Sequence, residues 1–375
     1  SDGRGSDGAD QRPRQAGKWV VREAWFGSSR HPCEGFLSGF GLKDRERKMV
    51  VTGAGGFVGG RFARFAGEQG LEVRVTARRS DAVEKLFSLG AGFIPADLAD
   101  AERVRTLCKD VDSVVHCAGA VGFWGRRQAF LLANVQLTEN VVEACLKEKV
   151  RRLVHLSSPS ICFDGRSHRG LKEDQVPRRF ANAYAATKYL AEQKVFGAQE
   201  FGLQAIALRP RLVTGAGDHS IFARLIKMQA KNRLAIVGNG LNVADFTSIG
   251  NLNQALLRSL QVGNAALGQV YNISNGQPVP LWDAINYVMR QMQLPQVRRY
   301  RSVGLASSMA MLNEAACLLW PGQPEPTLSR LGVQMMSKDF TLDISRARHY
   351  LGYDPQISLG SALDEFCAWS KAGHL

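Results

Sequence analysis

Residues 50–59 have the residue types and spacing of a phosphate-binding turn. Two valines end a strand, Gly53, Gly55 and Gly56 form a tight turn, and an amphipathic segment follows. This order places bare backbone N–H groups and the N-terminus of a helix where a pyrophosphate can sit. Three glycines alone are weak evidence, but the alternating segment 71–77 completes a βαβ unit. A nucleotide-binding site is therefore the leading hypothesis.

A second group of side chains could take part in chemistry at the same edge of the fold. Tyr184 and Lys188 lie four residues apart in a helical segment, so they share one face of that helix. Ser157 and Ser158 directly follow a predicted strand. Taken alone, the Tyr/Lys pair also fits an exposed aromatic ring beside a solvated ammonium group. Together with the glycine turn and the serines at a strand end, a functional pair is the better interpretation.

The elements that must position these residues alternate along the chain from Met49 to Pro210. This alternation predicts a Rossmann-type doubly wound parallel sheet of the α/β class, which binds ligands at the carboxyl ends of its strands. The first predicted strand ends at Val50-Val51, further strands are predicted at 71–77, 92–95, 113–116, 152–156 and 204–208, and helices are predicted at 57–70, 81–89, 101–109, 129–147 and 183–199. After Pro210 the pattern weakens, and we expect helices at 221–231 and 281–292 and a late strand at 270–273.

The chain divides into three parts on this basis. Residues 1–48 lack sustained periodicity, and Met49 stands just before the first strand, so we expect a disordered leader or a non-native extension. Residues 49–214 are expected to form the nucleotide-binding Rossmann domain, with residues 241–275 returning to its sheet. Residues 215–240 and 276–375 are expected to form a smaller, discontinuous substrate-binding lobe.

Composition excludes several classes of protein. The 375 residues contain no run of eighteen apolar residues, so no membrane-spanning helix is predicted. The seven cysteines lack a CxxC spacing and their number is odd, which favours reduced thiols and a cytoplasmic protein. Histidine spacing predicts no metal site. The net charge of +14 comes from dispersed residues without a nucleic-acid motif, so we expect attraction of anionic ligands and no nucleic acid.

Several motifs follow one another in the order found in extended short-chain dehydrogenases/reductases. They are TGAGGFVG at 52–59, Asp97-Leu98, His116-Cys117-Ala118-Gly119, Asn134-Val135, Ser157-Ser158, Tyr184-Ala-Ala-Thr-Lys188 and Arg209-Pro210. From Met49 onward the chain resembles this family of the NAD-dependent epimerase/dehydratase superfamily, in the branch of 3β-hydroxysteroid dehydrogenases, dihydroflavonol reductases and bacterial 3-oxoalkanoate reductases. It departs at Ala216-Gly217, where the family usually has Pro-Gly, and this affects only that turn.

The resemblance implies catalytic roles for three residues. Tyr184 would protonate a substrate carbonyl oxygen as hydride arrives, or accept the proton in the reverse reaction. Lys188 would hold the nicotinamide ribose and lower the pKa of the phenol by its positive charge. Ser158 would hydrogen-bond the substrate oxygen. Asn134 would steady the site, although a purely structural role fits it equally well.

The resemblance also implies the cofactor contacts. The expected cofactor-binding residues are Gly53, Gly55, Gly56, Phe57, Val58, Arg78, Arg79, Asp97, Leu98, Ala118, Gly119, Tyr184, Lys188, Pro210 and Val213. An NAD site places a carboxylate at the end of the second strand, for the ribose hydroxyls. Here Arg78 and Arg79 follow that strand, and two guanidinium groups suit the 2′-phosphate of NADP. We therefore expect NADP(H) to be preferred over NAD(H); two surface arginines opening a helix are the alternative.

The expected reaction is hydride transfer between NADP(H) and a secondary alcohol or ketone of a hydrophobic substrate, 3β-hydroxysteroid-like or 3-oxoacyl-like. Phe123 and Trp124 could wall an apolar substrate pocket, with ordinary packing as the alternative. Asn313 and Glu314 interrupt the apolar stretch 304–320, which favours a lobe helix or a channel wall and leaves peripheral membrane contact and a homodimer open. The rival functions are a sugar-nucleotide epimerase or dehydratase and a non-enzymatic nucleotide-sensing regulator.

Overall fold

A seven-stranded parallel sheet forms the centre of the computed structural model, which describes residues 48–77 and 91–374. The strands stand in the order β12-β7-β5-β4-β1-β2-β3, and every neighbouring pair is parallel. This confirms the predicted doubly wound sheet. The strands are β1 (Lys48–Thr52), β2 (Glu72–Thr76), β3 (Gly92–Phe93), β4 (Ser113–His116), β5 (Arg152–Leu156), β7 (Gln204–Pro210) and β12 (Gln269–Ile273).

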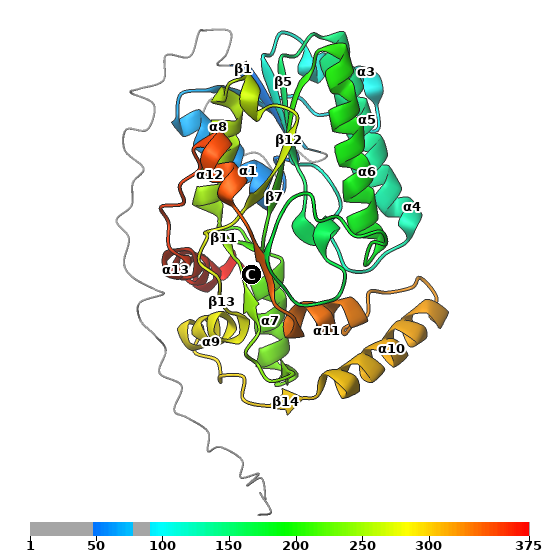
Figure 1. Ribbon diagram of the computed structural model, residues 1–375, viewed down its shortest axis with the longest axis vertical. Helices are drawn as coiled ribbons and strands as arrows, with labels where there is room; N and C mark the ends of the chain where they lie inside the picture. The colour runs from blue at the N-terminus through cyan, green and yellow to red at the C-terminus, as the bar shows by residue number, and fades with distance from the viewer. Residues whose placement is uncertain (1–47, 78–90, 375) are drawn as a thin grey trace, which may run out of the picture.

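Helices cover both faces of this sheet because its strands carry apolar side chains on both faces. In β1, Val50 packs into one core and Met49 and Val51 into the other. Helices α1 (Phe57–Glu68), α8 (Ile249–Gln261) and α12 (Ser345–Leu351) contribute to the core of one face. Helices α3 (Ala101–Cys108), α5 (Leu137–Lys147) and α6 (Ala183–Gly197) cover the other, as Figure 1 shows.

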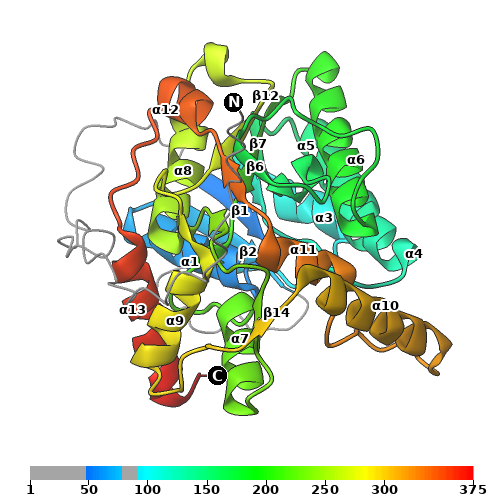
Figure 2. The same ribbon diagram turned by 60° about the horizontal axis from the view of Figure 1, so that its bottom comes forward.

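A second hydrophobic core, separate from the layers of core on the two faces of the large sheet, lies beyond the carboxyl ends of the strands. It is built by α7 (Ile221–Ala230), α9 (Leu281–Gln291), α10 (Val303–Leu319), α11 (Arg330–Ser337) and α13 (Leu359–Trp369). A small sheet, β13-β10-β15-β6, joins Val279–Pro280, Val243–Ala244, Phe340–Leu342 and His168–Leu171 from distant parts of the chain. Figure 2 shows α7, α9 and α13 below the large sheet. The predicted boundaries of the two lobes stay a prediction.

Most predicted elements between residues 49 and 292 are present. The segment predicted as one helix at 129–147 is helical from Arg127 to Lys147, as α4 (Arg127–Phe130), a π-helical turn at Leu131–Gln136 and α5. The strand predicted at 92–95 covers only Gly92–Phe93. The predictions for residues 1–47, for a helix at 81–89 and for Arg78 and Arg79 lie outside the described residues.

A buried ion pair joins the end of β7 to α6. Arg209 Nε and Nη2 donate to the two carboxylate oxygens of Glu192 at 2.8 and 2.6 Å, and both side chains are about 98–99% buried. Arg209 Nη1 also donates to the carbonyl oxygen of Glu173 at 2.8 Å, and Ser157 Oγ donates to Glu192. These bonds satisfy both charged groups and fix α6 against β5 and β7.

Loss of one member of this pair should destabilise the fold strongly. Arg209→Met leaves the Glu192 carboxylate buried without its counter-charge, which should lower the free energy of unfolding by about 3–5 kcal/mol in chemical denaturation. The matched control is Arg169→Met, because Arg169 pairs with Asp339 on the surface, and its loss should cost below about 1 kcal/mol. Equal losses for the two variants would contradict a structural role for the buried pair.

Candidate active site

The turn between β1 and α1 is shaped by glycines. Gly53 has φ +70°, and a Cβ there would lie 2.7 Å from the backbone nitrogen of Ala118 at the end of β4. A Cβ on Gly59 would collide with the carbonyl oxygen of Gly53, a requirement that the sequence analysis missed. Helix α1 begins after Gly56 without a side-chain cap and without an acidic residue in its first turn. The turn therefore fits a pyrophosphate, which would meet backbone N–H groups and the positive end of the helix.

Helix α6 carries the predicted catalytic pair. Asn182 starts the helix, since its Oδ1 accepts a hydrogen bond from Ala185 N at 2.9 Å. Tyr184, Lys188 and Glu192 follow at intervals of four residues, and all three are buried. The helix therefore turns a polar face inward, toward the carboxyl end of β5. The sequence analysis did not single out Glu192; continuing the four-residue spacing beyond Lys188 would have found it.

The structure brings Tyr184 and Ser158 together. Burial raises the pKa of Tyr184, and a side-chain hydrogen bond with Ser158 partly opposes this rise. Ser158 begins a 3-10 turn at Pro159–Cys162, and its Oγ lies 2.9 Å from Ser160 Oγ. The neighbouring Ser157 instead bonds Glu192. Of the two serines, Ser158 is thus the one beside the phenol, and Tyr184 keeps its proton at neutral pH.

Lys188 lies one helical turn from Tyr184. Its Nζ donates to the carbonyl oxygen of Leu156 at 2.6 Å and lies 3.4 Å from His155 Nε2. Burial lowers the pKa of Lys188 to about 8, while the carboxylate of Glu192 raises it. Lys188 is therefore mostly charged at neutral pH, and this charge depends on the buried carboxylate four residues away.

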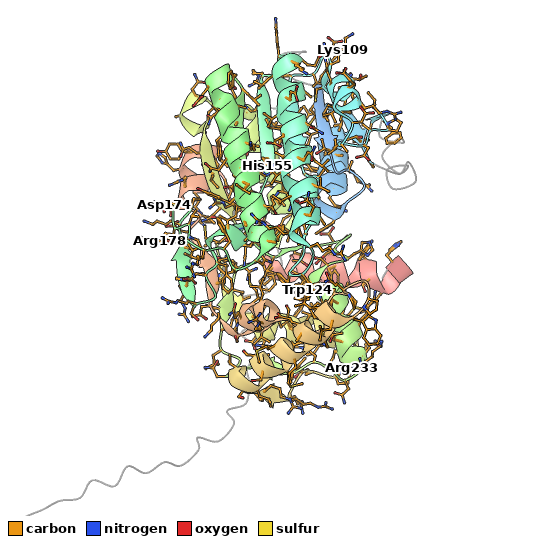
Figure 3. All side chains as sticks on the ribbon, turned by 90° about the vertical axis from the view of Figure 1, so that its right-hand side faces the viewer. Lys109, Trp124, His155, Asp174, Arg178 and Arg233 are labelled. Carbon is orange, nitrogen blue, oxygen red and sulfur yellow. The ribbon has the colours of Figure 1, made fainter. Side chains whose placement is uncertain are left out.

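Two histidines beneath Lys188 remain neutral. The rings of His116 and His155 are 5.4 Å apart, and Figure 3 shows His155 within the sheet, behind the helices. Burial and the charge of Lys188 lower the pKa of His116 to about 3 and the pKa of His155 well below its usual value. The positive charge of this cluster therefore resides on Lys188.

Asn134 links the site to its supporting elements. Its Oδ1 accepts from Ala120 N at 2.8 Å and its Nδ2 donates to Thr187 Oγ1 at 3.1 Å. Asn134 lies in the π-helical turn at Leu131–Gln136, a kind of turn that is frequent at functional sites. It holds the loop after β4 against α6. Gly119 packs beside it, because a Cβ there would be 2.9 Å from Asn134 Oδ1.

The other residues predicted for the cofactor are spread along the same edge of the sheet. Leu98 is buried and Asp97 exposed in the turn after β3, and Pro210 ends β7. Val213 lies in the short strand Val213–Thr214. The ring of Phe57 packs against the turn at Gly217, since a Cβ there would be 3.1 Å from it. The structure also describes three further residues that were predicted to bind the cofactor, Gly55, Val58 and Ala118.

The loop after β4 carries apolar side chains close to the start of α6. Phe123 is 40% exposed and Trp124 is half-buried; Figure 3 shows Trp124 between the helices of the large sheet and α10. Asn182 Nδ2 donates to the carbonyl oxygen of Gly122 at 3.4 Å, which fixes this loop beside α6. The ring of Phe130 lies 6.0 Å from that of Tyr184. Phe130 is an apolar neighbour of the phenol that the sequence analysis missed.

Comparisons with known proteins agree with this arrangement. A 2-alkyl-3-oxoalkanoate reductase of Stenotrophomonas maltophilia is 36% identical over 87% of this chain and 100% of its own length. A mouse sterol-4-alpha-carboxylate 3-dehydrogenase, decarboxylating, is 25% identical over 85% of this chain and 90% of its own. The UDP-glucuronic acid 4-epimerase of Bacillus cereus, solved with NAD, shares the fold, with a TM-score of 0.69, 23% identity and coverage of 87% and 99%.

These relatives confirm the predicted superfamily branch and an oxidoreductase activity on hydroxyl or keto groups. The model of the NAD dependent epimerase/dehydratase family matches residues 49–274. The chain therefore belongs to the NAD dependent epimerase/dehydratase family.

Proposed function

We propose that the protein is an NADPH-dependent reductase that interconverts a hydrophobic β-oxo acid and the corresponding β-hydroxy acid. The position of the Tyr184 phenol beside Ser158, one helical turn from the charged Lys188, carries this proposal. It places a proton donor and a second hydrogen-bonding group around one point, where a carbonyl oxygen would be bound.

The names of two relatives support the substrate class. A 3-oxoalkanoate carries its carboxylate two bonds from the keto carbon, and a sterol-4-carboxylate carries its own two bonds from the carbon that a 3-dehydrogenase oxidises. Both substrates are thus β-oxygenated acids with a large apolar part. Phe130 beside Tyr184, and Phe123 in the loop bonded to the start of α6, suit the apolar part, and the net charge of +14 favours an anion.

Each residue then has a defined task. When bound, a reduced nicotinamide supplies the hydride. Tyr184 O–H donates its proton to the carbonyl oxygen, and Ser158 Oγ donates a hydrogen bond to the same oxygen. Lys188 stabilises the phenolate that remains on Tyr184 and holds the nicotinamide ribose. The glycine turn at Gly53–Gly56 and the N-terminus of α1 hold the pyrophosphate.

The cofactor preference and the domain division belong to the same proposal. Arg78 and Arg79 would bind the 2′-phosphate of NADPH at the end of β2. The two hydrophobic cores support a nucleotide-binding domain and a smaller substrate-binding lobe.

A sugar-nucleotide epimerase is the second candidate, because it shares the fold. It is less favoured, since a sugar nucleotide would need many polar partners where Phe123 and Phe130 lie.

Tyr184→Phe should abolish most turnover without loss of cofactor. The variant keeps the ring and deletes the proton, and general acid catalysis is worth about 10²–10⁴-fold, so kcat should fall by that range while NADPH still binds by fluorescence titration. Tyr189→Phe is the matched control on the same helix, because the ring of Tyr189 packs against Phe180. Normal turnover of the Tyr184→Phe variant would contradict the assignment of Tyr184 as the proton donor.

Substrate preference can be measured in the oxidising direction with NADP⁺ and 3-hydroxy acids of increasing chain length. Each buried CH₂ contributes up to about 0.8 kcal/mol, so kcat/KM should rise by as much as about fourfold per carbon over the first several carbons. Trp124→Ala should flatten this rise, whereas Phe201→Ala, a change at a distant exposed ring, should not. A flat profile in the unmutated enzyme, or activity confined to UDP-sugars, would refute the substrate class.

Arg78→Ala tests the cofactor preference. Loss of a charged hydrogen bond to phosphate should weaken NADPH binding by about 1.5–3 kcal/mol, roughly ten- to a hundredfold, with little change for NADH. Arg64→Ala, on the exposed side of α1, serves as the control for loss of a surface arginine. Equal weakening of NADPH and NADH by Arg78→Ala would contradict a 2′-phosphate site.

A further inference from the structure

Helix α10 turns its large apolar side chains toward solvent. Leu312 and Trp320 are each 67% exposed and Leu319 is 88% exposed. Four further large apolar side chains of α10 are each about half exposed, namely Leu305, Met309, Met311 and Leu318. A helix on the surface of a soluble domain normally faces its apolar side inward, so the arrangement in α10 is reversed. An exposed apolar patch of this kind marks an interaction site that the apolar surface of a partner covers.

The inward face of α10 carries the small and polar residues. Ala306 and Ala310 pack against the second core. Glu314 Oε1 and Oε2 accept from Arg330 N and Nε, both at 2.7 Å, and Asn313 Oδ1 accepts from Leu328 N at 3.1 Å. The stretch 304–320 forms a helix, one of the two forms expected for it, and Asn313 and Glu314 do not interrupt its exposed apolar face because they turn inward. They fasten the helix to α11 and the preceding loop, and Glu314 is the one charged residue of α10.

Basic residues border this apolar face. Arg298, Arg299 and Arg301 directly precede α10 and are exposed. Strand β14 (Tyr300–Arg301) pairs with β9 (Ile236–Val237), which brings the exposed Lys231 and Arg233 to the same end of the molecule; Figure 3 shows Arg233 below α10. The nearby carboxylates are neutralised, because Glu325 pairs with Arg224 and Glu314 with Arg330. The border of the face is therefore positively charged.

The face leads to the candidate active site. Arg126 Nε donates to Gln323 Oε1 at 3.3 Å, which joins the loop after β4 to the turn that follows α10. That loop and the helix after it expose further apolar side chains, Val121 at 81% and Leu132 at 48%. Figure 2 shows α10 projecting from the body of the molecule. An apolar substrate could thus pass from an apolar partner bound to α10 to the loop at Phe123.

We propose that α10 and residues 298–301 form a docking surface for an anionic lipid bilayer, from which the enzyme takes its substrate. In the described part of the chain no helix is long and apolar enough to cross a membrane, so α10 lies along the interface with its apolar face in the acyl boundary. The basic border supplies attraction to anionic headgroups. The uptake of substrate rests on the proposed function, whereas the docking does not require catalysis.

Flotation of the full chain with vesicles tests this surface. The protein should float with phosphatidylcholine/phosphatidylglycerol vesicles and much less with phosphatidylcholine alone. Leu312→Glu/Leu319→Glu should lower the bound fraction at least tenfold, and Arg298→Glu/Arg301→Glu should remove the preference for anionic vesicles. Phe201→Glu is the matched control, because Phe201 is 75% exposed beyond the opposite end of the sheet, and it should bind as the unmutated protein does. Unchanged melting temperatures establish that each variant is folded.

Four results would overturn the proposal. The first is no flotation of the unmutated protein with anionic vesicles, and the second is equal flotation of Leu312→Glu/Leu319→Glu. The third is a dimer that this double variant converts to a monomer without any flotation, which assigns the face to a second copy. Protease protection of residues 1–47 that the double variant abolishes would likewise assign the face to the chain's own N-terminal segment. Failure of vesicle binding leaves the reductase proposal intact, since reductase activity on a soluble substrate is measured separately.

Discussion

The buried ion pair between Arg209 and Glu192 is the constraint on which the site depends. Two opposite charges this deeply buried are stable only while both are paired and hydrogen-bonded, so α6 cannot rotate or slide relative to β7 without a large penalty. Ser157, bonded to the same carboxylate, fixes the end of β5 as well. Because Ser158 follows Ser157 and Lys188 precedes Glu192 by one turn, the reacting groups take their positions from this pair.

The same carboxylate controls the charge of Lys188. Burial alone would favour the neutral amine, and the neutral His155 and His116 supply no counter-charge. Glu192 opposes this effect, although Arg209 already shares its negative charge. The pKa of the Lys188 ammonium group, about 8, therefore lies only slightly above neutral pH. A group in that condition responds strongly to any further charge that enters the site, such as a cofactor phosphate or a substrate carboxylate.

Local patterns in the sequence were enough for the large sheet and for the glycine turn, because strand alternation and the run of glycines are visible in neighbouring residues, although the clash that requires Gly53 is with the distant Ala118. Helix spacing and a strand end also pointed to Tyr184, Lys188 and the two serines, but the roles predicted for them, and the choice of Ser158, came from the family resemblance. Glu192 and Phe130 were missed because their importance comes from contacts with Arg209 and Tyr184, which are made only in the folded chain. For α10, apolarity along the sequence does not tell which face turns inward; the contacts of Glu314 with Arg330 decide that.

The shared fold with sugar-nucleotide epimerases does not select a substrate, because the elements in common are those that fix the cofactor and the proton donor. In the proposed reaction, the sheet order, the glycine turn and α6 would determine where hydride and proton are delivered. The rest of the substrate would meet other elements, namely the loop at Phe123 and the α10–α11 segment, which Arg126 and Gln323 connect. Since these elements lie outside the large sheet and make no hydrogen bond or ion pair with Arg209 or Glu192 in the described structure, their side chains can change without disturbing the buried ion pair. Specificity for an apolar acid can therefore arise beside an unaltered catalytic centre.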